Sequence, residues 1–187
     1  MDSKGIQIVR FKNSGEFELT IEGIQLLQSI QGPLGVIAII GPPGTGKSLL
    51  CKKLVSGRGE CKGGTMGMWA WPETLKVIKR DEDGTEYKLD LLVIDCEAIV
   101  CRSDGNKTRG LEILTLACLV SSQVVYFTDQ PLHTQSIPDL DIFGELPNVI
   151  TIRKHVDSFK SLHEYMPVLT WVIYGPDLTA PEASAGY

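Results

Sequence analysis

The stretch GPPGTGKS at residues 41–48 constrains this chain more than any other feature. It fits the pattern G-x-x-x-x-G-K-[ST] without a mismatch, and it stands between an unbroken apolar run (VIAII, residues 36–40) and a segment with helical spacing. Glycines allow successive backbone N–H groups to face an anion, and the helix that follows adds its positive N-terminal end. The stretch therefore predicts a phosphate-binding loop between a buried strand and a helix.

This chemistry gives particular residues particular roles. Lys47 is expected to reach the β and γ phosphates of a nucleotide, and the Ser48 hydroxyl to ligate Mg²⁺. Asp95 ends the next buried apolar run (LLVI, residues 91–94), where a carboxylate holds the metal through water, and Glu97 follows two residues later. The predicted nucleotide-binding residues are Gly41, Gly44, Thr45, Gly46, Lys47, Ser48 and Asp95.

The other apolar runs predict the fold class. Besides the strand at 36–40 and the helix at 48–55, strands are expected at 91–94, 124–127, 149–152 and 168–173, and helices at 110–120, 132–143 and 156–165. This alternation is typical of a three-layer α/β domain, here a P-loop NTPase with a mostly parallel central sheet. We expect a single domain over residues 1–187 because the chain contains no interdomain linker and no internal repeat.

Antiparallel features are expected around this core. Residues 74–80 and 86–91 flank the turn signal DEDG, which predicts one antiparallel edge hairpin. Upstream, FKNSGEFEL at 11–19 predicts a smaller hairpin. Thr20 is expected to cap a helix that runs through Ile24, Leu27 and Ile30.

Charge, cysteine usage and hydropathy exclude several classes of protein. A net charge of −5 argues against nucleic-acid binding, which needs a clustered positive surface. The five cysteines form no C-x-x-C pair, which favours reduced thiols. The sequence has neither a signal peptide nor an apolar run long enough to span a membrane. We therefore expect a cytoplasmic protein without an integral membrane segment.

A segment downstream of the loop, KGGTMGMWAWPE, gives the chain a family resemblance. Thr65, Gly67, Trp69 and Trp71 form T-x-G-x-W-x-W, which resembles the first switch region of guanylate-binding proteins, the dynamin-related large GTPases that include the atlastins. The stretch at 15–41, the IDCEA at 94–98 and the LACLVSSQVVYF at 116–127 agree with the family in order and spacing. The resemblance covers residues 17–171 and is to the N-terminal G domain.

The resemblance implies roles that the loop alone does not. Thr65 would join Ser48 and Asp95 as a ligand of Mg²⁺ and would sense the γ-phosphate, while Glu97 would help to organise the attacking water. The implied catalytic residues are Lys47, Ser48, Thr65 and Glu97, and the implied ligands are GTP or GDP. A homo- or heterodimer through the G domain is the implied assembly. The two tryptophans are expected to be packing anchors, one on each face of the sheet.

Departures from the family pattern bear on activity. Gly44 stands where the family carries an arginine that acts as a cis arginine finger, typically worth about 10³ to 10⁵ in rate. Ala98 replaces the glycine of D-x-E-G, and the base-reading T-L-R-D appears as residues 172–175 (VIYG), with Asp177 two residues further on. We therefore expect slow or absent hydrolysis, unless another arginine substitutes, with guanine or adenine preference left open. The candidate arginines are Arg58, Arg102 and Arg109.

Two other functions stay open at this stage. GPPGTGK is also frequent in AAA+ ATPases, although these place Asp and Glu side by side and Cys96 separates them here. The departures also fit a non-catalytic interaction module that pairs with a full-length homologue. Because G domains of the family continue beyond the point where this sequence stops, we expect an incomplete domain.

Overall fold

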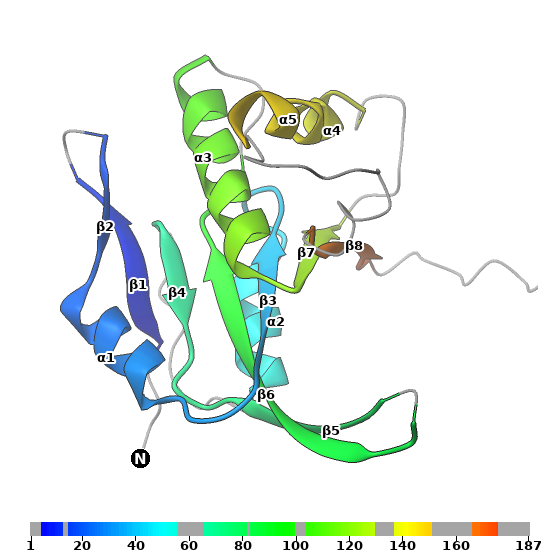
Figure 1. Ribbon diagram of the computed structural model, residues 1–187. Helices are drawn as coiled ribbons and strands as arrows, with labels where there is room; N and C mark the ends of the chain where they lie inside the picture. The colour runs from blue at the N-terminus through cyan, green and yellow to red at the C-terminus, as the bar shows by residue number, and fades with distance from the viewer. Residues whose placement is uncertain are drawn as a thin grey trace, which may run out of the picture.

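The computed structural model describes residues 5–12, 15–55, 66–81, 83–99, 104–129, 137–150 and 166–175. They form an eight-stranded sheet in the order β2-β1-β4-β6-β3-β7-β8, with β5 paired to β6 beside this path, and helices lie against both faces (Figure 1). The strands are β1 Ile6–Phe11, β2 Phe17–Leu19, β3 Leu34–Ile40, β4 Met68–Ala70, β5 Leu75–Arg80, β6 Glu86–Cys96, β7 Gln123–Thr128 and β8 Val168–Ile173. The helices are α1 Ile21–Ser29, α2 Lys47–Leu54, α3 Asp104–Val120, α4 Ile137–Gly144 and α5 Leu146–Val149.

The centre of the sheet is parallel, as the apolar runs predict. β3 lies between β6 and β7 and runs parallel to both, and β8 continues the parallel order beyond β7. Ile39 pairs with Asp95 of β6, and Ile40 pairs with Tyr126 of β7. The carboxyl ends of these strands therefore meet at one edge of the sheet, where ligands bind in open α/β folds.

The N-terminal hairpin is confirmed and extends the sheet with antiparallel strands. β1 pairs with β2 on one side and with β4 on the other, and β4 pairs in turn with β6. The Phe11 and Phe17 rings face each other across the hairpin with centroids 4.3 Å apart. Thr20 caps α1 as predicted, because its hydroxyl oxygen accepts a hydrogen bond from the Gly23 N–H at 3.0 Å.

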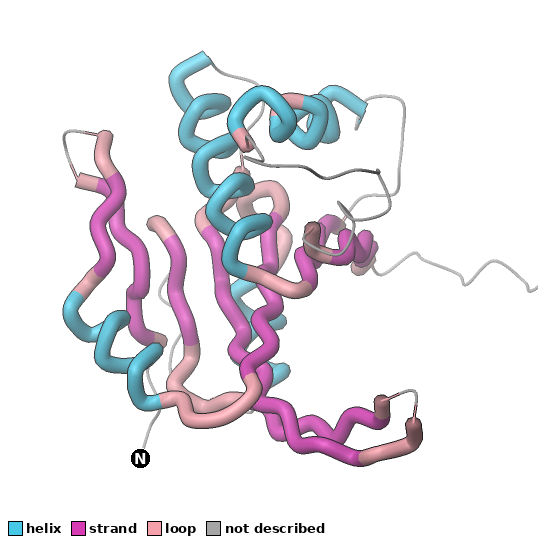
Figure 2. Tube along the Cα trace, viewed as in Figure 1, coloured by secondary structure: helices cyan, strands magenta, loops and turns pink. Residues whose placement is uncertain are grey.

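The second predicted hairpin is confirmed as β5 and the first half of β6. It projects from the body of the sheet as an arm (Figure 2). Beyond the arm, β6 runs on between β3 and β4, so one long strand belongs to both the hairpin and the centre of the sheet.

The connections after β6 and β7 differ in part from the prediction. α3 begins at Asp104, six residues before the expected start at residue 110. The strand expected at 149–152 is wrong at its first two residues, since Val149 ends α5 and Ile150 lies in a loop. Pro147 explains this, because proline is favoured in the first turn of a helix and disfavoured inside a sheet. α4 overlaps the expected helix at 132–143 and ends one residue after it. The expected helix at 156–165 is outside the described residues.

Two apolar clusters flank the sheet, and Trp69 and Trp71 belong to one side of it. Met68 and Ala70 point into the larger cluster, whereas Trp71 is 5% exposed and packs in the smaller cluster with residues of α2. Gly5 lies beside both indoles, because a Cβ there would be 3.8 Å from each ring. The expectation of one tryptophan on each face is therefore wrong, since side chains two residues apart on a strand share a face.

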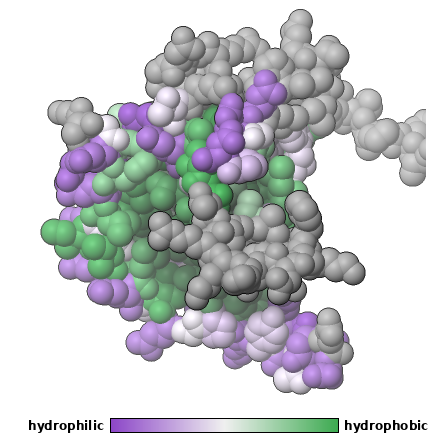
Figure 3. All heavy atoms as spheres, turned by 45° about the horizontal axis from the view of Figure 1, so that its top comes forward, coloured by the Kyte–Doolittle hydropathy of each residue, from purple (hydrophilic) through white to green (hydrophobic). Residues whose placement is uncertain are grey.

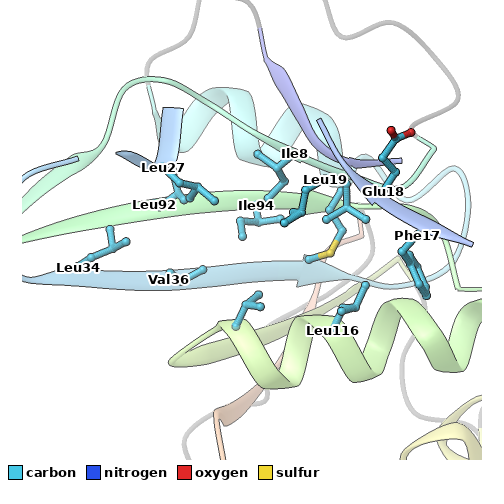
Figure 4. A pocket seen from close by; sticks show the side chains of 13 residues that line it. Ile8, Phe17, Glu18, Leu19, Leu27, Leu34, Val36, Leu92, Ile94 and Leu116 are labelled. Carbon is cyan, nitrogen blue, oxygen red and sulfur yellow. The ribbon is translucent and has the colours of Figure 1, made fainter. Parts of the chain in front are cut away.

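An apolar cavity of about 480 Å³ lies on the other side of the sheet, between α1, the strands and α3 (Figure 4). Among the aliphatic side chains that line it are Leu27 of α1, Val36 of β3, Ile94 of β6 and Leu116 of α3. Hydrophobic side chains also gather on this side of the surface (Figure 3). The exposed ones on the neighbouring elements are Leu19, Ile21, Ile24, Leu27, Leu34, Leu119 and Val120.

The approach of β4 to β1 leads to a stability prediction. Gly67 has φ +76°, and a Cβ there would collide with the carbonyl oxygen of Val9. Gly84 has a similar φ of +81° but open space around it, so it is a matched control. Gly84→Ala should cost about 1 kcal/mol of left-handed strain, and Gly67→Ala about 3 kcal/mol because the strands must also separate. Thermal denaturation of both variants measures this, and equal melting temperatures would contradict the close approach.

Candidate nucleotide-binding site

The loop at 41–48 has the backbone that a phosphate loop requires. It leaves β3 at Ile40 and enters α2 at Lys47, with Gly46 as the N-cap in the left-handed region at φ +89°. Gly41 and Gly44 also have positive φ, at +143° and +79°. A Cβ at Gly41 would collide with the Phe127 carbonyl oxygen, so glycine is required where the loop passes β7. The amides at the start of α2 therefore lie at the edge where the parallel strands end, and a helix N-terminus of this kind favours anions.

Lys47 is the buried cation of this loop. It is 7% exposed, and its Nζ donates a hydrogen bond to the Pro42 carbonyl oxygen at 2.7 Å. The Thr45 hydroxyl donates to the same oxygen at 3.1 Å. Burial lowers the pKa of Lys47 from its ordinary value, and attraction to Asp95 opposes part of this shift. The amine is thus held inside the curve of the loop, and its charge is incompletely solvated there.

Asp95 and Ser48 supply oxygen donors next to this lysine. Asp95 is 4% exposed and lies near the end of β6, paired with Ile39 of β3 and with Trp69 of β4. Ser48 is half-buried in the first turn of α2. A hydroxyl and a carboxylate fit Mg²⁺, which usually takes one or two protein oxygens together with phosphate and water. Within the described ranges, no three His, Cys, Asp or Glu side chains converge as a separate metal site.

Glu97 is bonded to the segment that leads into β4. Its carboxylate oxygen Oε2 accepts the Gly67 N–H at 2.7 Å, and its own N–H donates to the Gly67 carbonyl oxygen at 2.7 Å. These two bonds pair Glu97, directly after the end of β6, with Gly67, directly before the start of β4. Met66, the preceding residue, is fixed as well, because its carbonyl oxygen accepts bonds from Gln7 Nε2 at 2.8 Å and from Trp69 Nε1 at 2.9 Å.

Arg109 is the residue whose role the sequence did not indicate. Its Nη2 donates to Glu97 Oε2 at 2.8 Å, and its guanidinium carbon lies 3.9 Å from the centroid of the Phe11 ring. Arg109 was predicted only as a possible substitute for the missing arginine finger. No periodic pattern indicates its pairing with Glu97, because the two residues are 12 apart and lie on different elements.

Several predicted site residues lie outside the described residues. They are Thr65, Arg58, Arg102 and Asp177. Of the predicted site residues that are described, Gly41, Gly44, Thr45, Gly46, Lys47 and Ser48 form the loop and the helix start, and Asp95 lies beside Lys47. Cys51, Cys96 and Cys118 are buried thiols, and burial raises the pKa of Cys118 to about 11. In the described segments no helix combines the length and the apolar character needed to cross a bilayer.

Sequence comparisons relate this chain to known proteins. The family model described as guanylate-binding protein, N-terminal domain, matches residues 14–177. Guanylate-binding protein 5 of Mus musculus is 30% identical over 166 residues, which cover 81% of this chain and 26% of the relative. Guanylate-binding protein 2 of Homo sapiens is 26% identical over 170 residues, which cover 85% of this chain and 27% of the relative. A solved structure of an Aquifex aeolicus Era variant bound to GDP and AlF4⁻ gives a TM-score of 0.41 at 14% identity, covering 76% of this chain and 52% of that one.

A parallel sheet whose central strand ends in a G-x-x-x-x-G-K-S loop at a helix N-terminus defines the class of P-loop nucleotide-binding domains. Since the family model matches most of its residues, the chain belongs to the family of guanylate-binding protein N-terminal domains. The resemblance seen in the switch segment and in IDCEA is thereby confirmed. The chain spans about a quarter of the length of the relatives it matches.

The buried charge of Lys47 leads to a prediction for the protein without nucleotide. Lys47→Met should raise the free energy of unfolding by about 1 kcal/mol at pH 7, because the folded state holds the charged amine in a desolvated position. The folded pKa lies below the unfolded value of 10.5, so this gain is full below the folded pKa and disappears as the pH rises past 10.5. Urea denaturation at pH 7 and pH 11 measures the difference.

Lys53→Met is the matched control for this measurement, since Lys53 is exposed on the same helix. It should change stability little at either pH. A Lys47→Met variant that is less stable than the parent at pH 7 would mean that attraction to Asp95 outweighs the burial of the amine.

Proposed function

We propose that this chain binds a purine nucleoside triphosphate with Mg²⁺ at the loop of residues 41–48, and that it hydrolyses the nucleotide slowly or not at all. One observation carries the proposal: the buried Lys47 lies at the N-terminus of α2, inside a loop with three positive-φ glycines and beside the buried Asp95. A buried cation at a helix N-terminus is suited to a polyanion. GTP is the proposed nucleotide because the relatives are named as guanylate-binding proteins.

Each part of the proposed site has a role that follows from its chemistry. The loop amides bind phosphate oxygens, and Lys47 exchanges its bond to the Pro42 carbonyl for the β and γ phosphates. Mg²⁺, when bound, neutralises charge between these phosphates, with Ser48 as a direct ligand and Asp95 acting through water. Thr65 is proposed as the further ligand that distinguishes triphosphate from diphosphate.

Hydrolysis depends on groups that this chain keeps only in part. Glu97 is proposed to orient the attacking water. Gly44 supplies no guanidinium to the bridging oxygen, and Arg109 is already bonded to Glu97 and stacked on Phe11. Ala98 adds a Cβ where the family has glycine. These features support binding without rapid turnover.

The end of β8 is where base recognition is proposed. Tyr174 donates its N–H to the Thr128 carbonyl oxygen at 2.8 Å, and its ring stacks beside Phe127 with centroids 6.2 Å apart. Gly175 follows, in the position where the family has the guanine-reading aspartate, so guanine and adenine remain alternatives at this site. A single domain, a cytoplasmic location and a homo- or heterodimer through the G domain belong to the same proposal.

Ligand-induced stabilisation tests the proposed binding. Millimolar GTP with Mg²⁺ should raise the melting temperature, by an amount that corresponds to about 2.7 kcal/mol at a hundredfold excess over Kd. Lys47→Ala should abolish the shift, whereas Lys53→Ala should leave it intact. GDP and an ATP analogue, measured in parallel, report the phosphate and base preferences. An unchanged melting curve of the parent in every nucleotide would favour the non-catalytic interaction module.

A substitution at Gly44 tests the proposed slow turnover. The parent should hydrolyse GTP at about 10⁻⁴ s⁻¹, the level of small GTPases without a partner, and Gly44→Arg should accelerate hydrolysis by supplying the guanidinium. The space around Gly44 is open, but its φ of +79° strains any side chain. Gly44→Asn is therefore the control, because asparagine tolerates this conformation and carries no charge. Turnover of about 1 s⁻¹ in the parent would contradict the proposal.

A further inference from the structure

Glu97 is held by two donors that both reach the same carboxylate oxygen. Gly67 N–H and Arg109 Nη2 bond to Oε2 at 2.7 Å and 2.8 Å. The Glu97 side chain is 18% exposed, and neither of these bonds uses Oε1. A carboxylate fixed through one oxygen has a defined plane, and the other oxygen then has a defined direction.

Arg109 is itself held in place by contacts with β1 and with Glu97, the residue after β6. It lies on α3, and its guanidinium covers the Phe11 ring of β1 at 3.9 Å, while Phe11 packs on Phe17 of β2 at 4.3 Å. Among the described residues, Arg109 Nε is buried without a hydrogen-bond partner. The guanidinium therefore depends on Glu97 and on the face of the Phe11 ring for its stabilisation.

We propose that Arg109 is the positioning residue for Glu97. It fixes Oε2 against the Gly67 amide and leaves Oε1 as the oxygen that accepts a hydrogen bond from a water molecule at the nucleotide. Arg109 thereby acts on the reaction through Glu97 and does not itself contact the phosphates. The inference assigns to Arg109 a role different from that of an arginine finger, and for its effect on hydrolysis it rests on the proposed function.

The geometry favours this role over that of a finger. A finger must place a free guanidinium at the bridging oxygen, but the Arg109 guanidinium lies over the Phe11 ring and has one donor on a carboxylate that is only 18% exposed. If the guanidinium moved to the phosphates, the Glu97 carboxylate would lose its ion pair and would keep only the bond from the Gly67 N–H of the two described above. A half-buried ion pair of this kind orients its members strongly, because losing one partner leaves a poorly solvated charge.

Hydrogen exchange in the nucleotide-free protein tests the positioning directly. Arg109→Met should accelerate exchange of peptides containing the Gly67 and Glu97 amides by about tenfold, with the rest of the sheet unchanged. Arg109→Lys should show an intermediate rate, since it keeps the charge without the planar fork. Arg80→Met is the matched control, because Arg80 forms an ion pair with Glu86 at 2.6 Å on the exposed arm. Unchanged exchange in Arg109→Met would overturn the proposal.

Single-turnover hydrolysis separates positioning from a merely structural role. Arg109→Met should lower the rate about tenfold with GTP affinity within about twofold of the parent, and Arg109→Lys should restore part of the rate. Faster exchange with an unchanged hydrolysis rate would overturn the positioning role, as would hydrolysis and affinity that fall together. If the parent binds no nucleotide, the proposed function fails, and the exchange data then decide whether Arg109 positions Glu97. If Arg109→Met does not fold, hydrogen exchange and single-turnover hydrolysis are both measured on Arg109→Lys.

Discussion

The parallel pairing of β3 with β6 is the contact on which the rest of the structure depends. Six residue pairs, from Leu34 with Asp90 to Ile39 with Asp95, fix the register of the two strands. That register places Asp95 of β6 opposite Ile39, two residues before the loop begins at Gly41. Because a shift by one residue would turn every side chain to the opposite face, the buried isoleucines and leucines of both strands also determine where Lys47 and Asp95 meet.

A second constraint joins this parallel core to the antiparallel N-terminal strands. Gly67 approaches β1 so closely that only glycine fits, and its N–H and C=O both bond to Glu97 at the end of β6. Arg109 then connects the same carboxylate to Phe11 of β1. β4 is thus fixed from the end of β6 and from the N-terminal hairpin together. Because two donors bond to the Glu97 carboxylate, its side chain is favoured in a single orientation.

Much of the fold could be predicted from the sequence, because strands buried on both faces are unbroken apolar runs. The strands around residues 36–40, 91–94, 124–127 and 168–173 were predicted for this reason. The early start of α3 was missed since DGNKTR has no apolar period, and the false strand at Val149 came from treating a short apolar run as extended. Within the site, a linear motif predicted the loop and Asp95. The pairing of Glu97 with Arg109 depends on how α3 packs against β1, which no local pattern contains.

On the proposed function, the chain retains the groups that bind a nucleotide and lacks groups that accelerate its hydrolysis. In that proposal the loop amides, Lys47 and Ser48 would contact phosphate in the ground state and in the transition state alike, so they would supply affinity more than rate. An arginine at the loop acts on charge that develops only in the transition state, and its contribution of about 10³ to 10⁵ corresponds to about 4 to 7 kcal/mol of barrier. Replacing it with Gly44 removes that contribution and leaves the amides in place. The rate of hydrolysis then depends on the orientation of the attacking water, and this orientation depends on how firmly Glu97 is held.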